Sequence, residues 1–167
     1  MFMSESLFED IVSNNDIGSL LEEKDSSSSQ AWLVFSAGTR DYAVNSIDVK
    51  QILRNNSIFP IPFAPQYVKG IVNCNSKPMA VIDFSLFQGH PEQIKNLFLV
   101  LKNKCDVAFQ ITDVKEFQNS MNVTVQDFPD KTDVSFFSGA INLNDTIIPI
   151  LDIDSIISKV KVDLENS

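Results

Sequence analysis

The chain of 167 residues has few of the residues that build catalytic or nucleic-acid-binding sites. It contains one histidine, two cysteines, and 13 basic residues against 22 acidic ones. With Arg40 and Arg54 as its only arginines and a net charge of −9, it lacks the basic surface that binds DNA or RNA phosphates. Cys74 and Cys105 are too few for a disulfide framework or a zinc site, which takes about four ligands. We interpret both cysteines as ordinary residues rather than as a redox pair.

Catalytic and membrane-spanning motifs are also scarce. His90, followed by a proline, has no second histidine or nearby cysteine with which to form a base–nucleophile pair, so we expect it in a surface loop. No glycine-rich phosphate loop, catalytic triad, HExxH or CxxC motif occurs. No apolar run approaches the ~20 residues that span a bilayer, and the acidic N-terminus does not resemble a signal peptide. These absences favour a cytoplasmic binding module without cofactor or metal.

The first 29 residues differ from the rest. Leu7, Phe8, Ile11 and Val12 share one face at helical spacing, and a serine-rich linker occupies residues 25–29. Two interpretations stay open for this segment: an amphipathic helix that docks on the body or on a partner, or a frayed acidic tail.

From Gln30 onward the pattern is that of short strands. The turn Gly38–Asp41 separates two β-rich runs as in a hairpin, and a second turn is expected at Asn75–Ser76. Ser46 is placed to N-cap a short helix over Asp48–Leu53. The strands themselves are expected at residues 32–35, 42–44, 58–62, 70–74 and 79–83, the third being an edge strand that prolines end.

An internal repeat is the most informative feature of the sequence. Residues 32–52 align with residues 97–117 without a gap, at a shift of 65 residues. At a shift of 69 residues, Gly70 falls on Gly139 and Asp83 falls on Asp152. Both alignments keep the same order, which indicates a duplicated β unit.

A unit of this size with about five short strands suits a small closed barrel, because closure removes exposed sheet edges. Each barrel alone buries little, so the two are expected to share an apolar interface. We therefore predict a mainly β fold of two five-stranded barrels with short helices. The first repeat covers about residues 30–88 and the second about 94–158, with a join near 88–93 and a C-terminal tail at 159–167.

Two motifs have both a functional and a structural interpretation. Asp83, Asp152 and Asp154 could hold Mg²⁺ or Ca²⁺ in a metal-dependent enzyme. However, Asp83 and Asp152 each end a strand and begin a helical run, where an aspartate caps free N–H groups. Residues 60–65 are proline-rich enough to form a polyproline ligand, although prolines there would also end an edge strand. We favour the structural interpretation of both motifs.

These patterns resemble the CheW family of chemotaxis adaptors over about residues 30–158. The resemblance rests on Trp32–Phe35, on Val49–Leu53, on the string Pro62-Phe-Ala-Pro-Gln-Tyr-Val-Lys-Gly70, and on two strands that end in Asp83 and Asp152. It implies two intertwined SH3-like barrels and a protein that performs no chemistry. Such adaptors couple the cytoplasmic tips of chemoreceptors to the regulatory domain of the histidine kinase CheA, and they join CheW-like domains in rings.

The resemblance also implies where the partners bind. Receptor-binding positions would be Val49, Gln51, Gly70, Asn75, Leu97 and Phe117, and kinase-binding positions would be Ile58, Phe59 and Ile61. On this basis, Val49→Glu is expected to weaken receptor binding without unfolding the protein.

One departure from the family pattern concerns partner choice. The family has Asn-Leu-Arg-Gly where this chain has Asn73-Cys74-Asn75-Ser76. The missing arginine removes a charge that can pair with acidic groups on a partner. A divergent paralogue that serves another kinase pathway is therefore the alternative to the standard adaptor.

Overall fold

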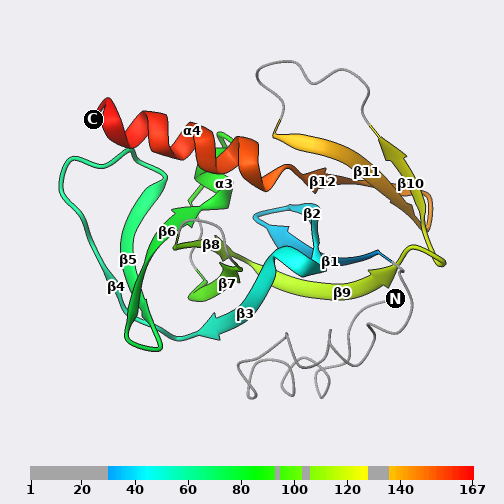
Figure 1. Cartoon of the computed structure of the whole chain (residues 1–167), viewed down its shortest axis with the longest axis horizontal. Helices are drawn as coiled ribbons and strands as arrows, with labels where there is room; N and C mark the ends of the chain where they lie inside the picture. Colours follow the sequence, from blue (N-terminus) through cyan, green and yellow to red (C-terminus); the bar gives the residue numbers. More distant parts are fainter. Residues whose placement is uncertain (1–29, 93–94, 103–105, 128–135) are drawn as a thin grey trace.

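The computed structural model describes residues 30–92, 95–102, 106–127 and 136–167. The N-terminal segment, the linker and Cys105 lie outside these residues. Figure 1 shows two β-sheets side by side, with one long helix running across both. In chain order the elements are β1 (Ala31–Ala37), β2 (Arg40–Asn45), the 3₁₀ turn η1 (Ser46–Asp48), β3 (Val49–Arg54), β4 (Ile58–Phe59), β5 (Val68–Cys74), β6 (Lys77–Asp83), α3 (Phe84–Phe87), β7 (Leu97–Leu101), β8 (Val107–Ile111), β9 (Asp113–Asn119), β10 (Thr124–Asp127), β11 (Phe137–Leu143), β12 (Thr146–Leu151) and α4 (Ile153–Glu165).

The two halves of the chain exchange strands. One sheet, called sheet A here, has the order β10-β11-β12-β2-β1-β9, and the other, sheet B, has the order β4-β5-β6-β8-β7-β3. Sheet A thus combines β1 and β2 of the first half with four strands of the second half. Sheet B combines β7 and β8 of the second half with four strands of the first. Each sheet has six strands rather than the expected five, and the expected intertwining is confirmed.

The internal repeat is visible strand by strand in this arrangement. β5 and β11 are related by the 69-residue shift, as are the starts of β6 and β12. In the two strand orders given above, each strand of sheet A has the same position as its repeat partner in sheet B. Each sheet also contains a single parallel pair, β12 with β2 and β6 with β8, and these pairs are repeat equivalents. The duplicated unit is therefore real in three dimensions.

The core has three parts, which explains why the strand sequences are apolar on both faces. A large shared cluster between the sheets includes Leu33, Phe35, Leu97 and Leu99. Alternate residues of the same strands point the other way, into a smaller core inside each barrel. Trp32 and Val34 enter the core of sheet A, and Phe98 and Val100 enter that of sheet B. A strand buried on both faces reads as a continuous apolar run, and the expected shared interface is present.

The helix expected over Asp48–Leu53 is wrong. A single 3₁₀ turn, Ser46–Asp48, occupies its start, and its N-cap is Asn45 rather than Ser46: the Asn45 side chain accepts a bond from the Ile47 N–H. Residues 49–54 form β3 instead, which pairs with β7 along its length. Pairing and burial of Val49, Ile52 and Leu53 outweigh the local helical spacing.

The segment expected to be a C-terminal tail belongs mostly to α4, which runs to Glu165. Its length has a simple cause, because Ile153, Ile156, Ile157 and Val160 lie on one face and pack into the shared core. The helix of the first repeat, α3, ends after four residues.

Candidate functional site

The residues expected to contact receptors lie mostly inside the protein. Val49 and Leu97 belong to the shared core cluster, and Phe117, which is half-buried on β9, packs against it. Val49 is 0% exposed, so it offers no side-chain surface to a partner, and Gln51 and Leu97 are also buried. This burial predicts that Val49→Glu destabilises the protein, contrary to the expectation from the sequence, because the substitution would bury a carboxylate in an apolar cluster.

Gln51 contacts the β5–β6 hairpin of sheet B, which carries Asn75 in its turn. The buried Gln51 amide lies 3.2 Å from the thiol sulfur of Cys74, next to the turn. Asn75 and Ser76 both have left-handed backbones, with φ of 52° and 67°. The equivalent turn of the second repeat, Asn144–Asp145, has the same conformation. The hairpin thus forms without the glycine of the family pattern, and the exposed Asn75 stands at its tip.

Gly70 has a structural role that accounts for its presence. Its φ is +142°, and a Cβ atom built there would lie 2.2 Å from the carbonyl oxygen of Phe59. Its repeat partner Gly139 sits equally close to an edge strand, since a Cβ there would lie 2.4 Å from the carbonyl oxygen of Gln126. Both glycines let an edge strand, β4 or β10, approach the neighbouring strand closely.

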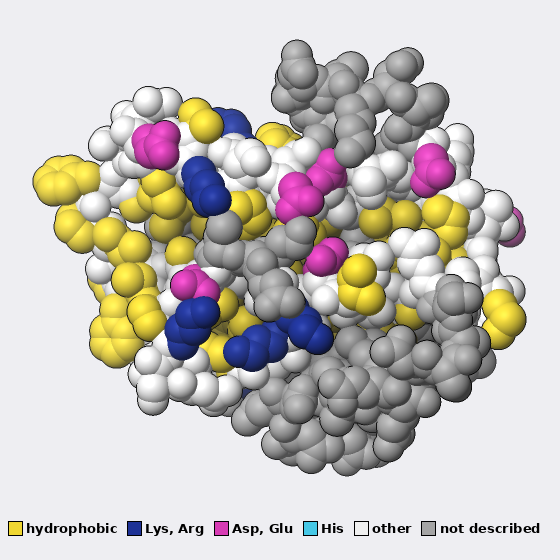
Figure 2. Space-filling view, in the orientation of Figure 1, with side chains coloured by type: hydrophobic (Ala, Val, Ile, Leu, Met, Phe, Trp, Pro, Cys, Tyr) yellow, Lys and Arg dark blue, Asp and Glu magenta, His cyan; other side chains and the backbone are white. Residues whose placement is uncertain are grey.

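The residues expected to contact the kinase lie at an exposed edge. β4 is the outermost strand of sheet B, and it pairs with β5 through Ile58 and Phe59. The Ile58 side chain packs on the barrel core, whereas Phe59 is 63% exposed and Ile61 is 38% exposed. Figure 2 shows hydrophobic side chains gathered along the side of the molecule that carries β4 and the loop after it.

Sequence reasoning missed the most exposed member of this surface. Phe63 is 91% exposed and has a left-handed backbone with φ of 60°. This φ also breaks a polyproline helix, which needs φ near −75°, so the polyproline interpretation of residues 60–65 is wrong. A large aromatic residue between two prolines of an edge segment was the available signal.

The loop that carries Phe63 is tied to α4. The Tyr67 hydroxyl donates a hydrogen bond to Asp163 at 2.5 Å, and Lys159, one turn earlier on α4, pairs with the same carboxylate. Burial, followed by the hydrogen bond and the negative charge of Asp163, raises the pKa of Tyr67. The Tyr67 ring also packs edge-on against Phe87, with 5.1 Å between ring centroids. We call the Tyr67–Asp163 bond the loop latch.

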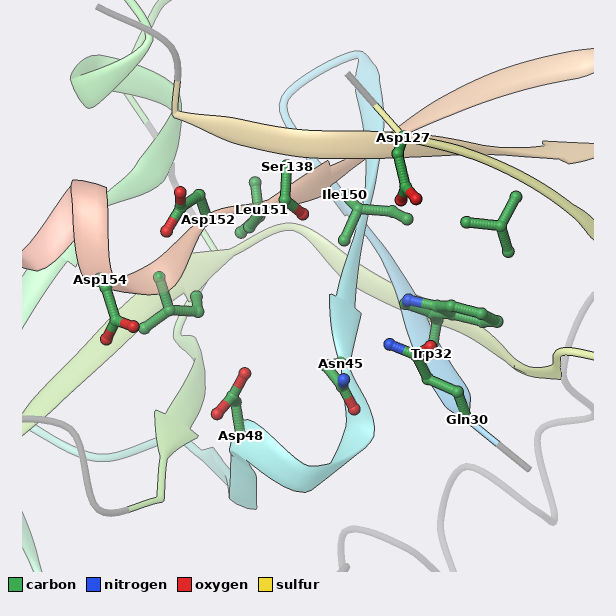
Figure 3. A pocket seen from close by; sticks show the side chains of 12 residues that line it. Gln30, Trp32, Asn45, Asp48, Asp127, Ser138, Ile150, Leu151, Asp152 and Asp154 are labelled. Atoms are coloured by element: carbon green, nitrogen blue, oxygen red, sulfur yellow. The ribbon is translucent and has the colours of Figure 1, made fainter. Parts of the chain in front are cut away.

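A half-open acidic pocket of about 240 Å³ lies on sheet A near the start of α4. Asp48, Asp127, Asp152 and Asp154 line it, and Figure 3 shows their carboxylates spread around it rather than converging. Within the described ranges, no group of three histidine, cysteine or acidic side chains could hold a metal ion.

The capping interpretation of the two repeated aspartates is confirmed. Asp83 accepts a bond from the Leu86 N–H at 3.0 Å at the start of α3. Asp152 accepts one from the Ser155 N–H at 3.1 Å at the start of α4. Among the described residues, the metal-enzyme alternative thus finds no ligand group.

Histidine and cysteine take ordinary places. His90 lies half-buried in the loop after α3, where its backbone N–H donates a hydrogen bond to the Ser85 carbonyl oxygen at 2.9 Å. Cys74 is a buried free thiol. No helix in the described part of the chain is long and apolar enough to cross a membrane.

Comparison with known proteins settles the family. The model of the CheW-like domain matches residues 31–161. The chain belongs to the CheW-like family. Chemotaxis protein CheW from Rhizobium meliloti (strain 1021) is 24% identical over 131 residues, which cover 74% of this chain and 84% of that protein. The crystal structure of the scaffolding protein TtCheW from Thermoanaerobacter tengcongensis has the same fold, with a TM-score of 0.64, 23% identity, and coverage of 74% of this chain and 89% of that one.

Membership confirms the resemblance found in the sequence and the mainly β architecture. The CheW-like family is one of chemotaxis scaffolds and adaptors. Among the described residues, the β4 edge with its following loop and the tip of the β5–β6 hairpin are exposed.

Proposed function

We propose that this chain is a non-enzymatic cytoplasmic adaptor that couples the cytoplasmic tips of chemoreceptors to the regulatory domain of the histidine kinase CheA within receptor arrays. The observation that carries the proposal is the apolar edge of sheet B. Phe59 and Ile61 remain exposed there, at 63% and 38%, on positions where the family resemblance implies the kinase. An exposed apolar patch on a folded domain marks a site of protein interaction.

The short β4 strand favours a side-chain contact over strand addition. β4 contains only two residues, and Pro60 and Pro62 follow it without backbone N–H donors. A partner therefore finds few backbone groups to pair with, whereas the side chains of Phe59 and Ile61 can enter an apolar pocket. A related barrel in the regulatory domain of CheA, or another CheW-like domain in a ring, would supply such a surface.

Most of the positions implied for the receptor are buried. Of the positions implied by the resemblance, Asn75 is exposed and Phe117 half-buried, and they lie on different sheets. Val49, Gln51 and Leu97 would act by supporting the backbone beneath a receptor contact rather than by touching the receptor. The receptor tip is a helical hairpin, which suits a helix-in-groove contact.

A divergent partner choice is the second candidate, and the β5–β6 turn favours it. The position of the family arginine is Asn75. The nearest cation in sequence, Lys77, pairs with Asp106 at 2.5 Å. An acidic group on a receptor or kinase would therefore meet a neutral amide at the tip. This candidate predicts a standard fold with a partner from another kinase pathway.

Separate pull-downs with receptor tips and with CheA regulatory domains test both candidates. We expect wild-type protein to bind both, and Phe59→Glu to weaken binding of the regulatory domain at least about tenfold, because a charge would enter an apolar contact. Ile147→Glu is the matched control, since Ile147 is 68% exposed on sheet A. Wild-type protein that binds neither partner would refute the standard adaptor and leave the divergent paralogue.

A further inference from the structure

Phe63 combines two costly features. Its ring is 91% exposed, and its backbone has a φ of 60°. A bulky side chain in the left-handed region is a genuine outlier, because Cβ approaches the following carbonyl group. Such conformations persist only where the surroundings impose them, and they cluster at functional sites.

The surrounding loop imposes this conformation through rigid contacts. Pro62 and Pro65 fix their own φ angles on either side of Phe63. The Val68 N–H donates to the Pro65 carbonyl oxygen at 2.9 Å, which closes a turn after Phe63. The carbonyl oxygen of Tyr67 accepts a bond from the Asp83 N–H at 2.8 Å. The loop is therefore tied to β6 through its backbone.

The side chains of the loop add two further attachments. Ala64 and Tyr67 pack against the shared core cluster. The loop latch then joins the Tyr67 hydroxyl to Asp163 of α4. Prolines, core contacts and the latch fix the backbone that carries Phe63. Binding through a side chain on such a fixed loop avoids the entropy cost of ordering the loop.

Further exposed hydrophobic side chains lie on the elements joined to this loop. Among the described residues, nine large hydrophobic side chains are exposed, and five of them lie on β4, on this loop or at the C-terminal end of α4. They are Phe59, Ile61, Phe63, Val162 and Leu164. The latch residue Asp163 lies between the last two in the sequence. Interfaces of this kind are dominated by a few aromatic anchors within a larger apolar surface.

We propose that Phe63 is the anchor of the contact with the kinase regulatory domain, and that Tyr67 and Asp163 are positioning residues that hold it in place. The proposal rests on the adaptor function above and adds its specificity-determining residue. The partner must offer an apolar pocket that accepts one aromatic ring, and the absence of charged side chains among residues 58–67 excludes a partner held there by ion pairs.

Substitution of the ring tests the anchor. Phe63→Asn keeps a residue that tolerates the left-handed backbone but removes the aromatic ring. We expect affinity for the CheA regulatory domain to fall about 30-fold, as for an interface hot spot, with the melting temperature unchanged or raised and receptor-tip binding unchanged. Phe63→His, which keeps an aromatic ring and also tolerates this backbone, should retain most of the affinity.

Met121→Asn is the matched control for the anchor. Met121 is 82% exposed in the turn between β9 and β10 of sheet A. Its substitution should therefore change neither the affinity for the regulatory domain nor the affinity for the receptor tip. Equal regulatory-domain binding by wild type and Phe63→Asn would overturn the inference while leaving the adaptor function intact. Loss of receptor binding alone, or of self-association alone, would also overturn it. A wild-type protein that does not bind the regulatory domain would remove both proposals.

Substitutions in the latch test positioning. Tyr67→Phe removes only the hydroxyl, and Lys159→Met removes the second partner of Asp163 while leaving the latch. We expect Tyr67→Phe and Asp163→Asn to speed hydrogen exchange at the Val68 amide and to weaken regulatory-domain binding severalfold, with Lys159→Met close to wild type. Faster exchange with unchanged affinity would show that the latch is only structural.

Discussion

Replacement of Gly70 by alanine measures how strongly β4 depends on one missing methyl group. The new Cβ would lie 2.2 Å from the Phe59 carbonyl oxygen and 2.7 Å from its carbon, both backbone atoms that cannot swing aside. The φ of +142° adds roughly 1–2 kcal/mol of strain for an L-residue. Relief of the contact requires β4 to leave β5, so we expect a total loss of about 3 kcal/mol.

Two other glycines separate the contributions. Gly89 also has a positive φ, +77°, but no atom lies within 4 Å of the position that a Cβ would take there, so Gly89→Ala should cost only the strain, roughly 1 kcal/mol. In Gly139→Ala the contact with the Gln126 oxygen is present, at 2.4 Å, while the φ of this residue lies outside the left-handed region. Its cost should fall between the other two.

Urea denaturation monitored by tryptophan fluorescence gives the free energy of unfolding for each variant. Trp32 is the single tryptophan of the chain and is buried in the core of sheet A, so its fluorescence reports unfolding. Costs for Gly70→Ala and Gly89→Ala that agree within about 0.5 kcal/mol would refute the contact as the reason for the glycine. Because β4 carries Phe59, Gly70→Ala should also weaken regulatory-domain binding without any change to the contacting side chains.

Four further predictions concern stability. Val49→Glu should destabilise the protein by about 3 kcal/mol or more through a buried carboxylate, and a wild-type melting temperature would contradict the burial of this position. Loss of the helix cap in Asp152→Ala should cost about 1 kcal/mol, and Asp83→Ala should cost more because Asp83 is 0% exposed; chemical denaturation that ranks them in the opposite order would contradict this. Hydrogen bonds with Lys159 and then Tyr67 lower the pKa of Asp163, so its stabilisation should be present above the unfolded pKa of about 3.9 and be lost as pH falls below it. Burial raises the pKa of Tyr67, so stability should fall as pH rises through its unfolded pKa of about 10, and thermal melts of Tyr67→Phe should show a smaller alkaline loss.

The repeat made much of the fold predictable. The alignment of residues 32–52 with 97–117 places β3 on β9, and both are strands. The local spacing around Val49 nevertheless favoured a helix, because a strand buried on both faces has no alternation to reveal it. The capping aspartates were predictable because each ends a strand and begins a helix, which fixes the chemistry of that position.

The candidate site was harder to predict, for a physical reason. Val49 and Leu97 are apolar residues in strands, and only the packing of the two sheets shows that they face the shared core rather than a groove. Phe63 was missed because exposure of an aromatic residue depends on the turn at Pro65 and on α4, which lies about a hundred residues later in the chain. Neither contact leaves a local pattern in the sequence.

The exchange of strands between the sheets has a consequence for the origin and assembly of this fold. Neither sheet is built from one copy of the repeat alone, because two inner strands of each come from the other copy. Two separate copies that traded their first hairpins would have the same arrangement, which is the geometry of a domain-swapped dimer. The present chain is equivalent to such a dimer whose subunits are joined near residue 90. Cleavage at that join should therefore leave two fragments that remain bound to each other, each supplying four strands of one sheet and two of the other.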